Sequence, residues 1–432
     1  MSISHKKGLL SLSPIIVLLV VYLVGSLLAG DFYRIPIGVA FVTAAVYAIA
    51  ITRGESLYKR VELFSQGAAN SNIMYMVWIF VLAGIFAESA KQMGAVDATV
   101  QLTLRFIPES VLPAGIFIAA CFISMSVGTS VGTIVALTPV VTALAEQMGC
   151  DVAWAVAIVV GGSFFGDNLS FISDTTIAAT QSQGCDMRDK FRTNLLIVLP
   201  AALATLLIYL FTDMTEGAVV AAAHSEWFRV LPYIVVIVCA LAGINVLGVL
   251  MLGIVVTDTI GVISGSFDAI SVFSAAGEGM GSMLELILVT LLAGGLMNVV
   301  KRGGGFDYLI SLLTSRISGR RTAESSIATL TALTNLCTAN NTIAILTAGP
   351  IARDIASRFG VSPRRSASLM DTVSCFVQGV IPYGAQLLMA SGLAAVSPLQ
   401  IIPHLYYPMG IGVMVVLAII FQFPREKSVS KS

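Results

Sequence analysis

The feature that most constrains this chain is a series of apolar runs, each close to the length that a helix needs to cross a lipid bilayer. A crossing helix takes about 17–25 predominantly apolar residues. Eight uninterrupted runs reach or approach that length, at residues 9–29, 35–52, 73–90, 193–212, 228–243, 246–264, 283–300 and 404–422. A chain of this kind buries its apolar surface in lipid, so we expect an all-α polytopic membrane protein.

The composition agrees with a lipid environment and excludes several classes of protein. Apolar residues make up 57% of the 432 residues, charged residues make up 11%, and the mean hydropathy is +0.92. The 24 basic and 24 acidic residues cancel, which leaves no case for a nucleic-acid partner. The six cysteines form no CxxC pair, and the HExxH, GxSG and GxGD motifs of membrane proteases are absent. We therefore expect no disulfide framework, no zinc site, no cofactor and no enzyme.

Four further apolar stretches are interrupted by Gly, Ser, Thr or Asn, at residues 111–147, 154–185, 325–350 and 366–396. Such interruptions predict helices that break inside the membrane, which is tolerated where the backbone is buried in protein or lines a polar cavity. Interrupted helices are common in secondary transporters, whose binding sites lie at the breaks. A channel does not require them.

The positions of Lys and Arg predict the orientation, because short cytoplasmic loops carry an excess of basic residues. We place the following clusters inside: Lys6/Lys7, Arg53/Lys59/Arg60, Arg188/Lys190/Arg192, Lys301/Arg302/Arg316/Arg320/Arg321, Arg353/Arg358/Arg364/Arg365 and Arg425/Lys427/Lys431. Stretches 111–147 and 325–350 then begin and end on the same side as hairpins, while 154–185 and 366–396 cross once. Both termini are cytoplasmic. The run 9–29 is too long for a signal peptide and is read as a retained first span.

The order of these segments contains a repeat with an offset of about 210 residues, marked by Leu82-Ala83-Gly84 and Leu292-Ala293-Gly294. Matched loops have opposite charge character, so the repeats are predicted to be inverted. The expected divisions are an N-terminal span (1–34), repeat 1 (35–212), a linker and extra span (213–245), repeat 2 (246–422) and a cytoplasmic tail (423–432). The fold class is an inverted-repeat secondary transporter with discontinuous helices, about 10 crossing helices and two hairpins, or 10–14 segments. Shared hydropathy alone also produces weak self-similarity.

Carboxylates without basic neighbours mark the first repeat as the candidate cation site. Residues 106–187 hold six acidic residues and no Lys or Arg, and Asp167 and Asp174 lie deepest in the interrupted stretch. Glycines allow this backbone to unwind and free its carbonyls, and hard cations such as sodium prefer carboxylate, hydroxyl and carbonyl oxygens. One carboxylate then exchanges a proton for a cation. The expected cation- and proton-binding residues are Asp167, Asp174, Asn168, Ser170, Ser173, Thr175, Thr129 and Ser130. Asp174 could instead cap a restarting helix.

The matching positions of the second repeat are neutral and rich in amides. They suggest contacts to a second ligand or a gate from Asn340, Asn341, Thr342, Gln378, Tyr383 and Gln386. Gln378 stands near the place of Asp167 in the repeat. Asp258 lies inside the apolar run 246–264 and could belong to the site or pair within the helix bundle.

At these residues the sequence resembles the NhaC family of sodium/proton antiporters, within the wider ion transporter superfamily. The likeness covers residues 35–422 and is strongest at Phe165-Gly166-Asp167, at Ser173-Asp174-Thr175-Thr176 and at residues 378–386. The family typically carries Lys and Pro where this chain has Asn168 and Phe171. The resemblance implies cation-coupled antiport, and its relatives include exchangers of malate against lactate with sodium and protons.

Two functions follow from this reading. The first is Na⁺/H⁺ antiport by alternating access in the plasma (inner) membrane, with sodium and protons competing for a buried carboxylate. The alternative is a sodium- or proton-coupled exchanger or symporter of a small organic acid or amino acid, for which the amides offer contacts but the central segments offer no Arg or Lys. The lipid bilayer and the transported ions are the expected partners, and assembly into a homodimer is left open.

Overall fold

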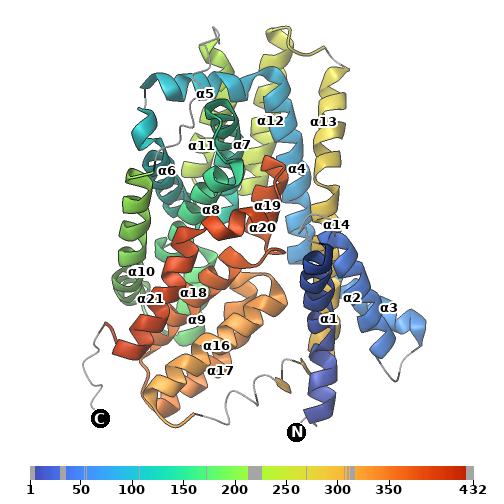
Figure 1. The fold of residues 1–432 in the computed structure, drawn as a ribbon, viewed down its shortest axis with the longest axis vertical. Coiled ribbons are helices and arrows are strands. Elements are labelled where there is room, and N and C mark those ends of the chain that lie inside the picture. Colours follow the sequence, from blue (N-terminus) through green and yellow to red (C-terminus); the bar gives the residue numbers. More distant parts are fainter. Residues whose placement is uncertain are drawn as a thin grey trace.

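The computed structural model describes residues 5–29, 36–52, 54, 56–106, 108–171, 173–212, 226–268, 270–305, 307–308, 311 and 317–424. Within these residues every regular element is a helix (Figure 1). The α-helices are α1 His5–Ala29, α2 Ile37–Ile51, α3 Leu57–Ala68, α4 Ser71–Met93, α5 Ala95–Phe106, α6 Leu112–Val127, α7 Ser130–Met148, α8 Val152–Leu169, α9 Asp174–Gln183, α10 Met187–Leu210, α11 Leu231–Leu241, α12 Val246–Ile263, α13 Ser271–Ser282, α14 Leu284–Arg302, α16 Arg320–Thr338, α17 Asn341–Phe359, α18 Pro363–Val380, α19 Ala385–Ala394, α20 Pro398–Ile401 and α21 Tyr406–Phe421. Three short 3₁₀ helices are η1 Glu109–Val111, η2 Trp227–Val230 and η3 Ile402–His404.

The length and apolar character of these helices confirm an all-α, multi-span membrane protein. In the described part of the chain, seven segments are long and apolar enough to cross a bilayer, and the bent pair Pro398–His404 and Tyr406–Phe421 brings the number to eight. Two of the seven are broken spans, Val152–Gln183 and Pro363–Ala394. Shorter apolar helices, including Ile37–Ile51 and Leu112–Val127, complete the bundle.

The first broken span consists of α8 and α9. Its break lies between Leu169 and Asp174, after the glycines at which we expected it. Helix α8 continues regularly through Gly161, Gly162 and Gly166 and ends at Leu169, after which Ser170 and Ser173 have extended backbones. The glycines are needed for packing, since a side chain at Gly162 or Gly166 would clash with α6. The expectation that these glycines unwind the helix is therefore wrong. They let α6 and α8 approach closely.

The second broken span consists of α18 and α19, and proline chemistry explains its break. Helix α18 ends at Val380, Ile381 is extended, and Pro382 cannot continue a hydrogen-bonded helix. Gly384 then occupies the N-cap position of α19 and has an extended backbone. Both broken spans thus place a helix C-terminus and a helix N-terminus in the interior of the protein.

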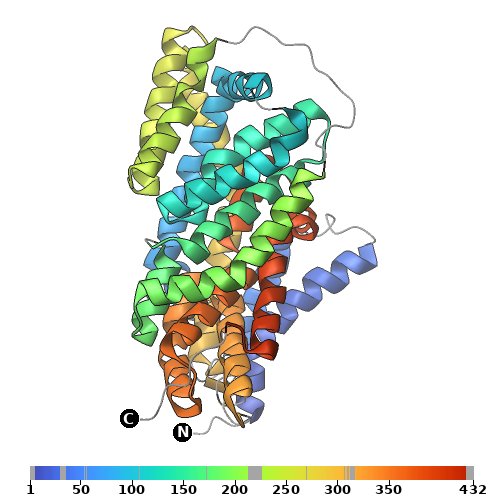
Figure 2. The same ribbon diagram turned by 90° about the vertical axis from the view of Figure 1, so that its left-hand side faces the viewer.

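Two hairpins, α6–α7 and α16–α17, each turn at a residue in the left-handed backbone region. Gly128 has φ 74° between α6 and α7, and Ala339 has φ 49° between α16 and α17. The α16–α17 hairpin lies in the lower half of the molecule in Figure 2, toward the marked N- and C-termini, whereas α6–α7 lies in the upper half. The second arm of each hairpin packs against the second half of the other broken span, α7 on α19 and α17 on α9.

Close glycine contacts explain the repeated Leu-Ala-Gly sequence. Gly84 on α4 meets the backbone of Gly279 on α13, and Gly294 on α14 meets the backbone of Gly67 on α3. In each case a Cβ atom would collide with the opposite backbone. The two motif glycines therefore lie at close helix crossings, Gly84 at that of α4 with α13 and Gly294 at that of α14 with α3.

Helices α11 and α12 form a further hairpin beside this core, seen at the upper left of Figure 2. Its turn contains Ile244 and Asn245, and the Asn245 side chain caps α12 by accepting from the Leu247 backbone N–H at 3.0 Å. The Tyr75 hydroxyl of α4 donates to the same Asn245 side chain at 3.0 Å. This contact holds the hairpin turn against α4.

Candidate functional site

The two hairpin turns and the breaks of the two broken spans meet at one polar cavity of about 620 Å³. Its lining includes both hairpin turns, the α8–α9 break and the start of α19, and the α11–α12 turn closes one wall. Among the predicted site residues, those that line it are Thr129, Ser130, Asp167, Ser173, Asp174, Thr175, Asn340, Asn341, Thr342, Gln378 and Gln386. The cavity thus brings together residues that lie more than 200 positions apart in the sequence, such as Ser130 and Gln386.

Asp167 provides the buried negative charge of this cavity. It lies in the last turn of α8 and is 4% exposed. The Ser130 backbone N–H donates to one carboxylate oxygen at 3.1 Å, and the Ser130 hydroxyl and the Asn341 amide donate to the other at 2.6 and 3.4 Å. Ser130 is the first residue of α7, so the carboxylate also faces the positive end of that helix dipole.

The donors around Asp167 are all uncharged. The lining of the cavity, among the residues that the structure describes, contains two acidic side chains, Asp167 and Asp174, and no Lys or Arg. Hydrogen bonds and the helix dipole therefore orient and stabilise the carboxylate without neutralising it. A carboxylate in this setting is chemically able to take up either a cation or a proton from the cavity.

Amides of the second half of the chain reach Asp167 through Ser130. The Gln378 amide donates to the Gln386 side-chain oxygen at 2.8 Å and to the Ala339 carbonyl at 3.0 Å. The Gln386 amide in turn donates to the Ser130 hydroxyl at 2.9 Å. One continuous hydrogen-bonded chain therefore connects the α16–α17 turn and the α18–α19 break with the carboxylate on α8.

Asp174 occupies a different position from Asp167. It is the first residue of α9, after Ser173 at the N-cap, and it is exposed at the cavity. A helix restarts here as the capping interpretation assumed, but Ser173 and not Asp174 occupies the N-cap position. Ser173 makes no side-chain capping bond and instead pairs with the Thr175 hydroxyl at 2.9 Å. Asp174 thus adds a second carboxyl group to the exposed part of the cavity lining.

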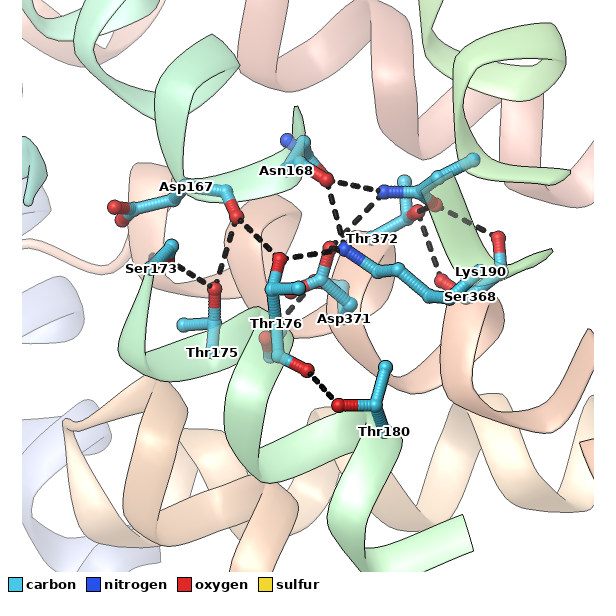
Figure 3. A network of polar contacts seen from close by, with 12 residues as sticks. Asp167, Asn168, Ser173, Thr175, Thr176, Thr180, Lys190, Ser368, Asp371 and Thr372 are labelled. Carbon is cyan, nitrogen blue, oxygen red and sulfur yellow. Dashed lines mark hydrogen bonds and ion pairs between the residues drawn. The ribbon is translucent and has the colours of Figure 1, made fainter. Parts of the chain in front are cut away.

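A second buried carboxylate, Asp371 on α18, is paired with Lys190 on α10 (Figure 3). The ammonium lies 2.7 Å from a carboxylate oxygen, and the two residues are 1% and 0% exposed. Asn194, one turn further along α10, donates to the same oxygen at 3.0 Å. Sequence analysis assigned Lys190 to a cytoplasmic loop cluster. The structure instead places it in the protein interior, because α10 starts at Met187 and directs Lys190 inward. The interrupted stretches themselves contain no Lys or Arg, as predicted, but Lys190 reaches two of them from α10.

The backbone carbonyls at the α8–α9 break already have protein donors. Thr175 and Thr176 hydroxyls donate to the Asp167 carbonyl at 3.0 and 3.4 Å, and Lys190 and Asn194 donate to the Asn168 carbonyl at 2.8 and 2.7 Å. Figure 3 shows the Asp167 carbonyl facing this network while its carboxylate points away. The predicted role of freed carbonyls as cargo ligands is therefore not what this conformation displays.

The remaining predicted residues lie outside the cavity. The Asn168 amide donates to the Phe164 carbonyl and the Tyr407 hydroxyl, and Ser170 donates to the Met125 carbonyl. The Tyr383 hydroxyl donates to the Leu336 carbonyl at 2.7 Å. Asp258 is half-buried on α12 and does not line the cavity. The Asn168, Ser170 and Tyr383 side chains thus connect helices around the site.

Sequence reasoning missed Lys190, Asn194 and Asp371 as a group. A usable signal was present in α10, where Lys190, Asn194, Ile197, Val198 and Ala201 share a buried face at helical spacing. A lysine and an amide one turn apart on the apolar face of a membrane helix indicate an internal polar partner.

Comparisons with known proteins give a consistent family assignment. A model described as the Na⁺/H⁺ antiporter family matches residues 7–214 and 218–423. The chain is 22% identical to the Na⁺/H⁺ antiporter NhaC of Alkalihalophilus pseudofirmus over 362 residues, covering 77% of this chain and 78% of that protein. It is 22% identical to NhaC of Bacillus subtilis over 76% of this chain and 80% of that protein.

A third relative has a different printed activity. The malate-2H⁺/Na⁺-lactate antiporter of Bacillus subtilis is 20% identical over 96% of this chain and 94% of that protein. Among solved structures, the YdaH transporter of Alcanivorax borkumensis matches 84% of this chain and 88% of its own with 16% identity and a TM-score of 0.41, which is too distant to inform the fold.

Proposed function

Because this chain belongs to the Na⁺/H⁺ antiporter family and is a membrane transporter, not an enzyme, we propose that it exchanges sodium for protons at Asp167. The resemblance to NhaC that the sequence motifs indicate is thereby confirmed. The observation that carries the proposal is a buried carboxylate that faces a cavity and has no basic partner there.

One site suffices to couple the two fluxes. Sodium and a proton both neutralise the Asp167 carboxylate, so that binding of one excludes the other. The three donors from Ser130 and Asn341 fix the carboxylate in place while one face of it remains directed at the cavity. Release of a proton on one side and of sodium on the other then constitutes antiport.

Alternating access is supported by the arrangement of the two hairpins. The turns of α6–α7 and α16–α17 contribute to the same cavity, and inverted repeats with broken helices at a shared site are typical of secondary transporters. We place the end that carries the two marked termini in Figure 1 in the cytoplasm, together with the last turns of α17, which contain Arg353 and Arg358, following the excess of positive charge.

A second candidate cargo is a small organic acid or amino acid. The cavity is within the range of about 300–1,000 Å³ that small-molecule sites occupy, and the amides of Asn340, Asn341 and Gln386 line it. A dicarboxylate such as malate would nevertheless face Asp167 and Asp174 with no basic side chain in the described lining. We therefore propose sodium as the cargo and test malate and lactate as competitors.

The experiment uses proteoliposomes that contain a pH-sensitive dye. An inward sodium gradient should alkalinise the lumen with the wild type, and Asp167→Asn should lower the rate to that of protein-free liposomes. Asp268→Asn, the same change on the exposed α12–α13 connection, should leave the rate unchanged. Retention of the signal in Asp167→Asn refutes the role of Asp167, and a signal that appears only with malate or lactate supports the second cargo.

A further inference from the structure

The surroundings of the Lys190 ammonium have the composition of a cation site. Its nitrogen lies 2.7 Å from the Asp371 carboxylate, 2.8 Å from the Thr176 hydroxyl and 2.8 Å from the Asn168 carbonyl. The three oxygens come from three helices, α18, α9 and α8 (Figure 3). Carboxylate, hydroxyl and carbonyl oxygens are the ligands that hard metal cations take from proteins.

This oxygen cage is separate from the cavity at Asp167. Lys190, Asp371, Thr176 and Asn168 are all buried, and none of them lines the cavity. The two sites share the α8–α9 break, because the Thr176 hydroxyl also donates to the Asp167 carbonyl at 3.4 Å. The cage is thus built beside the proposed cargo site and is filled by a side chain of the protein.

The oxygen cage around Lys190 and the site at Asp167 differ in net charge by one unit. Asp371 and Lys190 cancel each other, whereas Asp167 has no basic side chain within the described lining of its cavity. A buried carboxylate that lost its ammonium partner would be strongly destabilised unless another cation replaced it. The cage therefore requires one positive charge, and lysine supplies it without an ion being bound.

We propose that the Lys190 ammonium occupies a second cation-binding site, in the place of a free sodium ion, so that cargo sodium binds only at Asp167. This inference rests on the proposed cation exchange. It assigns Lys190 a specificity-determining role, because it limits the number of sodium ions that the protein binds. Removing the side chain while keeping Asp371 should open the cage to sodium.

The central variant is Lys190→Ala, and its matched control is Lys190→Met. Alanine leaves a space beside Asp371 that sodium can enter, whereas methionine fills most of the same volume with an uncharged chain. Equilibrium binding of radioactive sodium to the purified, detergent-solubilised protein counts the sites. We expect one sodium ion per chain for the wild type and Lys190→Met, two for Lys190→Ala, and one for Lys190→Ala combined with Asp371→Asn.

Combination with Asp167→Asn separates this inference from the proposed function. Lys190→Ala in that background should bind one sodium ion, and Asp167→Asn alone should bind none. If Asp167→Asn alone retains sodium, the proposed function fails, while the second site is still judged by whether the added ion depends on Asp371. Equal binding by Lys190→Ala and Lys190→Met overturns the inference.

The wild type provides a test that does not depend on the folding of Lys190→Ala. If the wild type binds two sodium ions and Asp371→Asn removes one of them, the lysine does not fill the cage and the inference is wrong. A thermal-unfolding assay in sodium chloride and in choline chloride adds a second readout. Sodium should raise the melting temperature of Lys190→Ala more than that of Lys190→Met.

Discussion

Asp167 and Asp371 are two buried aspartates on the two broken spans, and they have opposite surroundings. Asp167 is 4% exposed, faces a cavity of about 620 Å³ and accepts only uncharged donors. Asp371 is 0% exposed, does not line that cavity and holds an ammonium at 2.7 Å. Both carboxylates are expensive to place in a membrane protein, but within the described residues the protein pairs only Asp371 with an oppositely charged side chain.

If Asp167 is the exchange site that we propose, the difference means that burial alone does not define such a site. A carboxylate that is permanently paired contributes to packing and specificity, and its removal leaves a buried cation without a partner. A carboxylate that is oriented by dipoles but not neutralised is free to bind a mobile charge. The comparison therefore predicts that mutations at Asp371 act mainly on stability and mutations around Asp167 act mainly on ion binding.

The largest expected effect is on stability at Asp371. Asp371→Asn strands Lys190 in the protein interior, and we expect the free energy of unfolding to fall by about 3–5 kcal/mol. Asp167→Asn removes no ion pair, and its cost should stay within about 1.5 kcal/mol. Unfolding of both variants in mixed detergent micelles, followed by tryptophan fluorescence, measures the difference. Equal losses would mean that the two aspartates are not distinguished by pairing.

An intermediate effect is expected for the hydroxyl that contacts Asp167. Ser130→Ala removes a 2.6 Å hydrogen bond to the carboxylate, and a charge-assisted bond of this kind contributes about 1.5–3 kcal/mol. Sodium affinity should therefore fall by about tenfold or more, measured as the sodium concentration for half-maximal exchange. Ser163→Ala serves as control, because that buried hydroxyl donates only to the Val160 carbonyl of its own helix. The same loss in both variants would point to a general packing defect.

The smallest effect on sodium affinity is expected at Gln386, which is one hydrogen bond further from Asp167 than Ser130 is. Gln386→Leu removes the donor to the Ser130 hydroxyl but leaves the contact from Ser130 to Asp167 in place. A neutral hydrogen bond contributes about 0.5–1.5 kcal/mol, so sodium affinity should fall by about two- to tenfold. Gln400→Ala, in the exposed capping box of α20, should not change it. A loss at Gln386 larger than that at Ser130 would show that the amide contacts the cargo directly.

Much of the architecture was predictable, because hydropathy and helix-breaking residues act locally. Runs of apolar residues located the spans, and the interrupted stretches 111–147, 154–185, 325–350 and 366–396 located the helix turns and breaks. The membrane strengthens such predictions, since unsatisfied backbone groups are not tolerated in lipid. The role of Gly162 and Gly166 was misjudged for a related reason. Glycine favours both unwinding and close packing, and only the partner helix α6 decides between them.

The candidate site was predictable at Asp167 and not at Lys190. Asp167 lies in a long stretch without basic residues, and that is visible in the order of residues alone. The contact of Lys190 with Asp371 joins residues 181 positions apart, so it depends on how α10 packs against α18. Counting basic residues near span ends assigns Lys190 to the cytoplasm, because such a count ignores which face of a helix a residue occupies.

The convergence of both hairpin turns on one cavity has an electrical consequence. Tyr75 and Asn245 line this polar cavity and are exposed, so the cavity opens to the outside of the protein. With water inside it, we expect the cavity to support little of the transmembrane voltage and most of the voltage to fall across the packed residues behind Asp167, among them Lys190 and Asp371. A charge that moves through that layer experiences about 2.3 kcal/mol for each 100 mV. On this expectation, the broken helices concentrate the electric field of a whole bilayer on a short segment of protein beside the proposed cargo site.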